Sequence, residues 1–203
     1  MTTFLRKEIV DYKAVILDMD GTLYYQVPVR ICMAFELFFY YLCHLNKIPD
    51  LCAIYKYRKK NEAGELQKQD SNISVWMQEK PKKHVRFFRD KKLIAMAHIM
   101  QQRGVKIVVY SDYPLKEKLD ALSPFRPDLA FSADDAEIQC LKPNNKGLLH
   151  IVNILNLPVE DIVFIGDRFE KDAICAKQTG MDYIILNRLF FTRNQIYKKF
   201  KMQ

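Results

Sequence analysis

The stretch that decides the fold is Lys13-Ala-Val-Ile-Leu-Asp18-Met-Asp20-Gly21-Thr22-Leu23. Its apolar, β-branched first half predicts a buried strand over residues 13–18. The strand ends at two aspartates that are one residue apart, and side chains with that spacing point the same way in a strand. Gly21 lets the backbone bend sharply directly after them. We therefore expect Asp18 and Asp20 to face one small volume at the end of a buried strand.

Two carboxylates that lie this close repel each other, so the fold must supply a compensating group. A divalent cation, a shared proton or a nearby lysine would each serve. Asp and Gly are also ordinary turn residues, so this stretch alone is compatible with a plain strand end. The rest of the chain bears on the choice between these interpretations.

Length and composition are those of a soluble globular protein. The 203 residues are enough for one domain, or for one domain with an insertion. We expect no secretory signal in residues 1–13, and the most apolar window, residues 31–45, contains Glu36 and His44 and is too short to span a bilayer. The 5 cysteines form no CxxC pair, so we expect reduced thiols in or near the core of a cytoplasmic protein. No membrane partner is expected.

The net charge of +8 is unevenly placed. Between residues 56 and 92, Lys and Arg outnumber Asp and Glu by 12 to 5, and the residues after Asn187 carry basic side chains and no acid. Such runs are usual on solvated surfaces, which is the interpretation we favour. They also suit an electrostatic funnel for an anionic small molecule or a weak nucleic-acid surface. Nucleic acid is therefore not an expected partner, although the charge leaves that possibility open.

Further apolar runs bounded by turn residues predict strands over residues 105–110, 128–131, 161–165 and 183–186. Helical periodicity lies between them, over residues 93–100, 114–122, 145–155 and 170–179. This alternation predicts an α/β fold in which a Rossmann-like parallel sheet carries helices on both faces, giving three layers.

Residues 24–89 show no strand pattern and predict helices over residues 28–44, 51–60 and 73–79. The predicted organisation is an α/β core of residues 1–23 and 90–203 with an inserted all-helical segment of residues 24–89. The first helix of this segment is apolar around most of its circumference, so we expect it to be buried against other helices. A substrate wall or a dimer face is the alternative.

Polar side chains directly follow three of the predicted strands. They are Asp18 and Asp20, Ser111 and Asp112, and Asp167. In open α/β sheets, sites form beyond the carboxyl ends of the strands, near the topological switch point. Lys142 and Asp172 add a cation and a further acid to the set. Oxygen ligands of this kind suit Mg²⁺.

These residues resemble, in order and context, the four motifs of the haloacid dehalogenase superfamily, whose members are mostly phosphatases. The matching residues are Asp18-Met-Asp20-Gly21-Thr22, then Ser111, then Lys142 before Pro143, and finally Gly166-Asp167-Arg-Phe-Glu-Lys-Asp172. The motifs span about residues 13–186, and the helical segment after the first motif is similar in position to that family's helical cap. One departure is Lys171, which stands where a small polar residue is common.

The resemblance implies a Mg²⁺-dependent phosphomonoester hydrolase with four catalytic residues, Asp18, Asp20, Ser111 and Lys142. Asp18 would be the nucleophile that forms an aspartyl-phosphate. Asp20 would protonate the leaving oxygen and then act as a base on water, which requires a pKa near the working pH.

The same resemblance implies which residues hold the metal ion and the phosphate. Mg²⁺ would be bound by Asp18, the backbone carbonyl of Asp20 and Asp167, with Asp172 beside them. The substrate's phosphate would be held by Ser111, Asp112, Lys142 and the backbone N–H groups of Met19 and Asp20. We expect Arg168, Glu170 and Lys171 to be solvated.

The family's architecture implies a small phosphorylated metabolite as the substrate, because a cap over the active site obstructs large molecules. A phosphotransferase or phosphomutase of the same superfamily is an alternative that the motifs do not separate from a hydrolase. A catalytically idle binding or regulatory module is a third possibility. A dehalogenase is disfavoured, because that branch usually lacks an acid at the position of Asp20. The sequence leaves open both the substrate's identity and whether the protein is a monomer or a homodimer.

Overall fold

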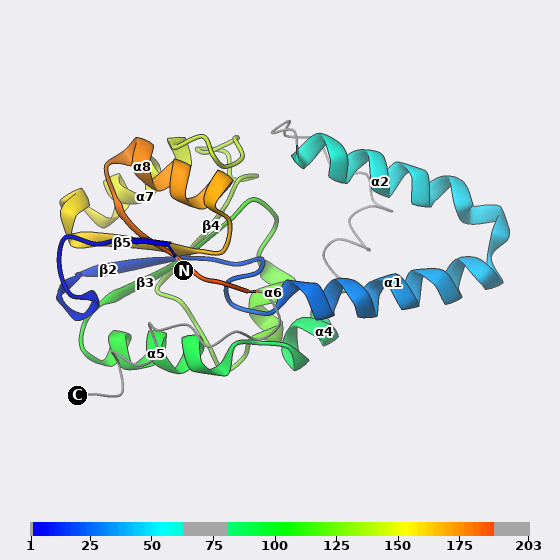
Figure 1. Ribbon diagram of the computed structural model, residues 1–203, viewed down its shortest axis with the longest axis horizontal. Coiled ribbons are helices and arrows are strands. Elements are labelled where there is room, and N and C mark those ends of the chain that lie inside the picture. The colour runs from blue at the N-terminus through cyan, green and yellow to red at the C-terminus, as the bar shows by residue number, and fades with distance from the viewer. Residues whose placement is uncertain (1, 63–80, 189–203) are drawn as a thin grey trace.

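The computed structural model describes residues 2–62 and 81–188. Its sheet has six strands in the order β1-β6-β5-β2-β3-β4. The sheet lies between two layers of helices, and α1 and α2 extend away from it (Figure 1). The strands are β1 (Thr2–Phe4), β2 (Ala14–Asp18), β3 (Lys106–Ser111), β4 (Leu129–Ser132), β5 (Ile162–Gly166) and β6 (Asp182–Ile185). All neighbouring strands are parallel except β1 and β6. The predicted parallel α/β sheet is confirmed, with one short antiparallel edge strand that we did not expect.

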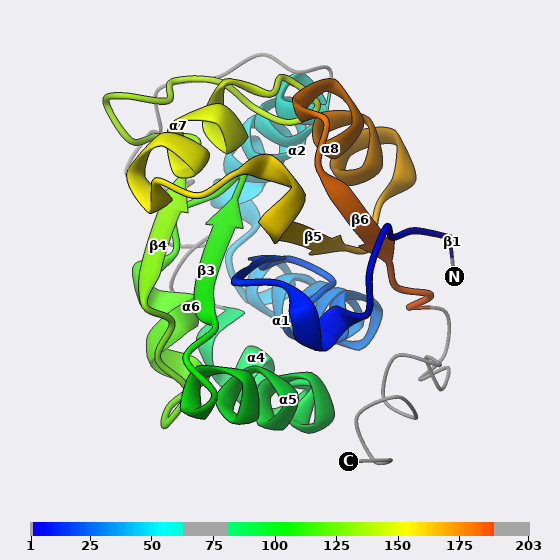
Figure 2. The same ribbon diagram turned by 90° about the vertical axis from the view of Figure 1, so that its left-hand side faces the viewer.

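Helices cover both faces of the sheet (Figures 1 and 2). One face packs on α5 (Lys91–Gln102), and the other on α7 (Lys146–Leu155) and α8 (Ile174–Thr179). Alternate residues of β2 serve the two faces, so Val15 and Leu17 belong to the first cluster and Ala14 and Ile16 to the second. Burial on both faces explains why the strand is continuously apolar.

The shorter helical elements fill the connections. A helix α6 (Lys116–Ala121) follows β3, and a π-helix η5 (Phe169–Ala173) runs directly into α8. Short 3-10 turns lie at Ile9–Asp11, Leu45–Lys47 and Val159–Asp161.

A helical insertion follows β2, as predicted. It contains α1 (Gln26–Cys43), α2 (Ile48–Glu62) and α4 (Pro81–Phe87), of which α4 was not expected. The helix predicted over residues 73–79 and the basic side chains after residue 188 lie outside the described residues. The two links between insertion and sheet pair with each other, because Tyr24 bridges Arg89 and the Asp90 N–H donates to the Leu23 carbonyl at 2.9 Å.

The helix α1 is largely exposed, so our expectation that it is buried was wrong. Only Val29 and Tyr41 of α1 are buried, and its exposed apolar side chains are Val27, Ile31, Phe35, Phe38, Phe39 and Leu42. Its main neighbours among the described elements are α4 and the turn at Leu45–Lys47. The helix has 18 residues and a mean hydropathy of 1.2, so by length and composition alone it could cross a membrane, contrary to our expectation. Core helices of soluble proteins meet the same criterion.

The cysteines divide between core and cap. All 5 are free. Cys175 is buried, as expected, whereas Cys43 and Cys52 are exposed on the insertion. The expectation of thiols packed in or near the core was therefore wrong for those two.

Candidate active site

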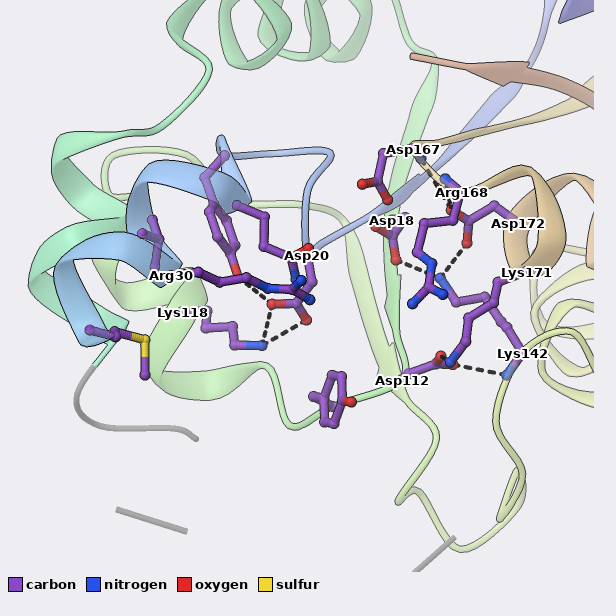
Figure 3. Close-up of a pocket in the computed structure, with 15 residues that line it drawn as sticks. Asp18, Asp20, Arg30, Asp112, Lys118, Lys142, Asp167, Arg168, Lys171 and Asp172 are labelled. Carbon is purple, nitrogen blue, oxygen red and sulfur yellow. Dashed lines mark hydrogen bonds and ion pairs between the residues drawn. The ribbon is translucent and has the colours of Figure 1, made fainter. Parts of the chain in front are cut away.

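The candidate site lies at the carboxyl ends of β2, β3 and β5. These ends meet because β2 pairs with β3 on one side and with β5 on the other. A pocket of about 70 Å³ opens there, lined by side chains from the sheet ends, the following loops and α1 (Figure 3). The sheet topology thus brings distant parts of the chain together. The most widely separated residues that line the pocket, Asp18 and Asp172, are 154 positions apart in the sequence.

Gly21 makes the close approach of two strand ends possible. Its φ of +94° lies in the left-handed region, and a Cβ at this position would stand 2.1 Å from Asp167 Oδ2. A residue with a side chain would therefore both strain the turn and displace Asp167. The Asp-x-Asp-Gly pattern is thus required by packing as well as by chemistry.

Three carboxylates gather in this volume. Oxygen atoms of Asp18, Asp167 and Asp172 all lie within 4.8 Å of one another. Burial and the charges of Asp172 and Asp167 raise the pKa of Asp18 well above its ordinary value, although Lys142 acts in the opposite direction. Burial and the charge of Asp172 also raise the pKa of Asp167, to about 7. The cluster therefore holds more negative charge than its surroundings compensate.

Lys142 is the cation of this cluster. Its buried Nζ lies 2.5 Å from Asp18 Oδ1 and 2.7 Å from Asp172 Oδ1. Burial alone would lower the pKa of Lys142, but the charges of Asp172 and Asp18 outweigh it and raise that pKa well above its usual value. Lys142 is therefore a fixed positive charge beside Asp18, in the position expected from the sequence.

Asp172 is fixed by the backbone that precedes it. Its Oδ2 accepts hydrogen bonds from the N–H groups of Asp167 at 3.1 Å and Arg168 at 3.0 Å. A Cβ on Gly166 would lie 2.4 Å from the same oxygen. Both carboxylate oxygens of Asp172 thus accept hydrogen bonds from protein groups, one from Lys142 and one from the backbone of the loop after β5. Asp172 therefore orients both the lysine and this loop.

Asp20 points away from the acidic cluster. Its carboxylate accepts hydrogen bonds from the Tyr24 hydroxyl and from Ser111 Oγ at 3.2 Å. It also accepts hydrogen bonds from Lys118 Nζ at 2.6 and 2.7 Å (Figure 3). Burial would raise the pKa of Asp20, but the charge and hydrogen bonds of Lys118 outweigh it and lower that pKa. The proton-donor role implied for Asp20 requires a pKa near the working pH. That requirement is not met in this arrangement, because a buried lysine faces the carboxylate.

Ser111 and Met19 lie at the strand ends, but their side chains contact other protein groups and do not line the pocket. Ser111 is fully buried, donates to Asp20 and accepts a hydrogen bond from the Tyr113 N–H at 3.1 Å. The Met19 side chain belongs to the hydrophobic core. Phosphate contacts by Ser111 Oγ and by the backbone of Met19 and Asp20 therefore remain predictions.

Lys171 and Asp112 form a buried ion pair. Lys171 Nζ lies 2.9 Å from Asp112 Oδ2, and Asp112 Oδ1 accepts the Lys142 N–H at 2.9 Å. Both side chains are no more than 10% exposed. The expectation that Lys171 is solvated was wrong, because the π-helix η5 turns it toward the end of β3. Arg168 lines the pocket and binds the exposed Glu170 at 2.8 Å.

Sequence reasoning missed Lys118, Tyr24 and Arg30, which all line the pocket. A signal for Lys118 was available, because Leu115, Lys118 and Leu122 have the spacing of one helix face, and all three are buried. A lysine on an apolar helix face needs a buried partner, which here is Asp20. Tyr24 and Arg30 follow the first motif and carry no comparable signal.

Comparison with known families matches residues 12–180 to a family model described as haloacid dehalogenase-like hydrolase. No curated protein sequence matches this chain.

Solved structures with the same fold cover nearly the whole chain. The HAD phosphatase from Thermococcus onnurineus has 19% identity and a TM-score of 0.63, covering 94% of this chain and 97% of its own. YfnB from Bacillus subtilis bound to magnesium has 14% identity and a TM-score of 0.62, with coverages of 87% and 89%. CbbY from Rhodobacter sphaeroides, in complex with xylulose-1,5-bisphosphate, has 15% identity and a TM-score of 0.62, covering 90% of each chain.

The similarity in fold agrees with the family match, which covers well over half of the sequence, and with the acids and lysine that the sheet brings together. The chain belongs to the haloacid dehalogenase-like hydrolases.

Proposed function

We propose that this hydrolase is a Mg²⁺-dependent phosphatase of small phosphate monoesters that works through an aspartyl-phosphate at Asp18. The observation that carries the proposal is the buried arrangement of Asp18, Asp167 and Asp172 around Lys142. Such a site attracts a divalent cation and an anionic group together. The similar structures support the same class, since one is called a phosphatase and another holds a sugar bisphosphate.

The donor atoms present fit Mg²⁺. Asp18 Oδ2 and Asp167 Oδ1 are buried and have no hydrogen-bond partner among the described residues. Unpartnered buried carboxylate oxygens are costly unless a cation compensates them, and Mg²⁺ prefers oxygen ligands. Asp18 and Asp167 would hold the ion, with the Asp20 backbone carbonyl and Asp172 beside it. The bound ion would reduce the repulsion between the Asp18 carboxylate and the phosphate.

The chain's own residues account for the two chemical steps. An Asp18 oxygen attacks phosphorus while the ester P–O bond breaks, and Asp20 gives its proton to the leaving alcohol oxygen. Asp20 then takes a proton from a water molecule, which attacks phosphorus and releases inorganic phosphate and free Asp18. Lys142 stabilises the negative charge on the phosphoryl oxygens throughout.

The contacts of Asp20 fit the second step better than the first. Bound to Lys118 and Tyr24, Asp20 is an ionised carboxylate, which is the form that accepts a proton. To donate a proton, Asp20 would have to exchange Lys118 for the leaving oxygen of the substrate. Such an exchange is consistent with a cap helix beside the pocket, because closure of a cap expels water and rearranges polar contacts.

The test is phosphate release from a panel of small phosphate monoesters, measured with Mg²⁺ and with a chelator. The wild type is compared with Asp18→Asn, and added sugars reveal transfer of phosphate to a hydroxyl other than water. We expect Mg²⁺-dependent release that Asp18→Asn abolishes. Release that persists in Asp18→Asn, with deamidation and contaminating phosphatase excluded, would refute the mechanism. Phosphate that appears on the added sugar instead of in water would make the protein a transferase.

A further inference from the structure

Equal numbers of acidic and basic side chains line the pocket, but not every one of them is paired. Five acids and five bases line it, namely Asp18, Asp20, Asp112, Asp167, Asp172, Arg30, Lys118, Lys142, Arg168 and Lys171. The three lysines are each bound to carboxylates of the pocket. Only the two arginines form no ion pair with a pocket carboxylate within the part of the chain that the structure describes.

The two arginines differ in their surroundings. Arg168 belongs to the loop after β5, where its Nε binds Glu170 and the charges of Glu170, Asp167 and Asp172 act on it. Arg30 stands on α1, and among residues 2–62 and 81–188 no hydrogen bond or ion pair is found for it. Its charge acts on Tyr24, where it opposes the rise in pKa that burial causes. Arg30 is therefore the pocket cation that the protein leaves without a counter-ion.

One face of α1 carries Arg30 into the pocket. Gln26, Val29, Arg30 and Met33 have helical spacing and all line it, so Arg30 is the single ionic side chain that α1 contributes. Figure 3 shows Arg30 extending toward Asp20, on the opposite side of the pocket from Lys142 and Asp172. Its guanidinium is a planar fork of donors that matches a carboxylate or a phosphate.

The side of the pocket on which Arg30 lies identifies what it would bind. Asp18 and Lys142 mark where the transferred phosphoryl group sits, whereas Asp20 marks the oxygen that leaves. A cation beside Asp20 therefore faces the leaving group. We infer that the substrate is a phosphate monoester whose leaving group carries a second oxyanion, bound by Arg30; this inference rests on the proposed phosphatase function.

The test uses matched pairs of esters at fixed ionic strength. The neutral members, in which the leaving group is uncharged, are ethyl, propyl and butyl phosphate. The acidic members are the phosphates of the hydroxy acids with two, three and four carbons, and a third series carries a second phosphate in place of the carboxylate. Because the length that spans from Asp18 to Arg30 is set by the pocket, we expect the preference for the anionic ester to peak at one chain length.

Arg30→Gln, Arg30→Lys and a control variant, Lys56→Gln, decide whether Arg30 is responsible. Lys56 is an exposed cap cation on α2 that does not line the pocket, so its substitution reproduces the change in net charge alone. The readout is the ratio of kcat/KM for the anionic ester to that for its neutral partner. The wild type should show a ratio of about ten or more, as expected for one charge-assisted hydrogen-bonded pair. Arg30→Gln should reduce this ratio about tenfold, Arg30→Lys less, and Lys56→Gln should leave it unchanged.

Calorimetric binding in the Asp18→Asn background separates failure of this inference from failure of the proposed function. If no ester is hydrolysed, the phosphatase proposal fails, and tighter binding of the anionic ester that depends on Arg30 would still support the inference. The inference is overturned if neither rates nor binding prefer an anionic ester at any length, or if Arg30→Gln keeps the full preference. Whichever series responds, carboxylate or second phosphate, identifies the oxyanion.

Discussion

Lys118 Nζ lies 2.6 Å and 2.7 Å from the two carboxylate oxygens of Asp20, so α6 supplies a buried counter-ion to the residue that moves protons. The Lys118 side chain is 4% exposed and that of Asp20 is 14% exposed. The pair therefore fixes both the orientation and the charge of Asp20.

Lys118→Met should impair hydrolysis of the aspartyl-phosphate, the step in which Asp20 acts as a base. Without the charge of Lys118, burial raises the pKa of Asp20, so less of this carboxylate is ionised. Esters with good leaving groups depend most on that step, so we expect kcat for a nitrophenyl phosphate to fall by about 10- to 100-fold and kcat for an alkyl phosphate to fall less. Lys116→Met, an exposed lysine on the same helix, is the control. A larger loss for the alkyl ester would show that Lys118 does not act by keeping Asp20 ionised.

Gly21→Ala should disturb the metal site as well as the turn. Gly21 and Gly104 both have positive φ, but only at Gly21 would a Cβ collide with Asp167. Gly104→Ala should cost about 1–2 kcal/mol of unfolding free energy and leave Mg²⁺ affinity unchanged. Gly21→Ala should cost more and weaken Mg²⁺ binding, measured by calorimetry, about tenfold or more. Equal effects of the two substitutions on Mg²⁺ affinity would contradict this account.

Asp167 should make the stability of the metal-free protein depend on pH. Its pKa is raised from 3.8 to about 7 in the folded state, so the folded protein binds more protons than the unfolded chain between those values. Stability from this group is therefore lost as pH rises toward 7. Asn at position 167 cannot ionise, so the unfolding free energy of Asp167→Asn should not show this loss. Measured by chemical denaturation, the difference in unfolding free energy between Asp167→Asn and the wild type should shift in favour of the variant by more than about 1 kcal/mol from pH 5 to pH 8.

Mg²⁺ provides the complementary measurement for Asp167. Because a ligand must be deprotonated to bind, the ion should raise the melting temperature of the wild type more at pH 8 than at pH 5. In Asp167→Asn the ion should have little effect at either pH. A wild-type shift that does not depend on pH would show that Asp167 is not a ligand.

The Lys171–Asp112 pair should be strongly coupled. Removing one partner leaves a buried charge without compensation, so Lys171→Met or Asp112→Asn alone should cost about 3 kcal/mol. The loss of unfolding free energy in the double variant should be at least about 1 kcal/mol smaller than the sum of the losses in the two single variants. The exposed pair Lys106–Asp128, at 3.3 Å, is the matched control and should show a coupling of about 0.5 kcal/mol or less. Coupling no larger than in this control would mean that Lys171 is not held by Asp112.

The sequence was most informative where strand ends carry chemistry. Asp18, Asp167 and Asp172 were predicted because parallel strands place their carboxyl ends at one edge of the sheet, whatever their distance along the chain. Lys118 and Lys171 were not, because a lysine on a helix is normally a surface residue, and only the three-dimensional arrangement shows which carboxylate it meets. The lysine that lowers the pKa of Asp20 was therefore missed.

Burial of α1 could not be predicted from its pattern. An apolar circumference indicates a buried helix only if neighbours surround it, and among the described elements those of α1 cover little more than Val29 and Tyr41. The short strand β1 was missed because three residues give too little alternation to be distinguished from a coil.

The central claim, that Asp18 carries the phosphoryl group, is tested most directly by trapping that intermediate. Asp20→Asn removes the base for its hydrolysis, and a nitrophenyl phosphate removes the need for the acid in its formation. After acid quenching in the presence of Mg²⁺, peptide mass spectrometry should find one phosphoryl group on Asp18, labile to hydroxylamine. Wild-type turnover of the same ester, with the phosphoryl group on another residue or on none, would contradict the account.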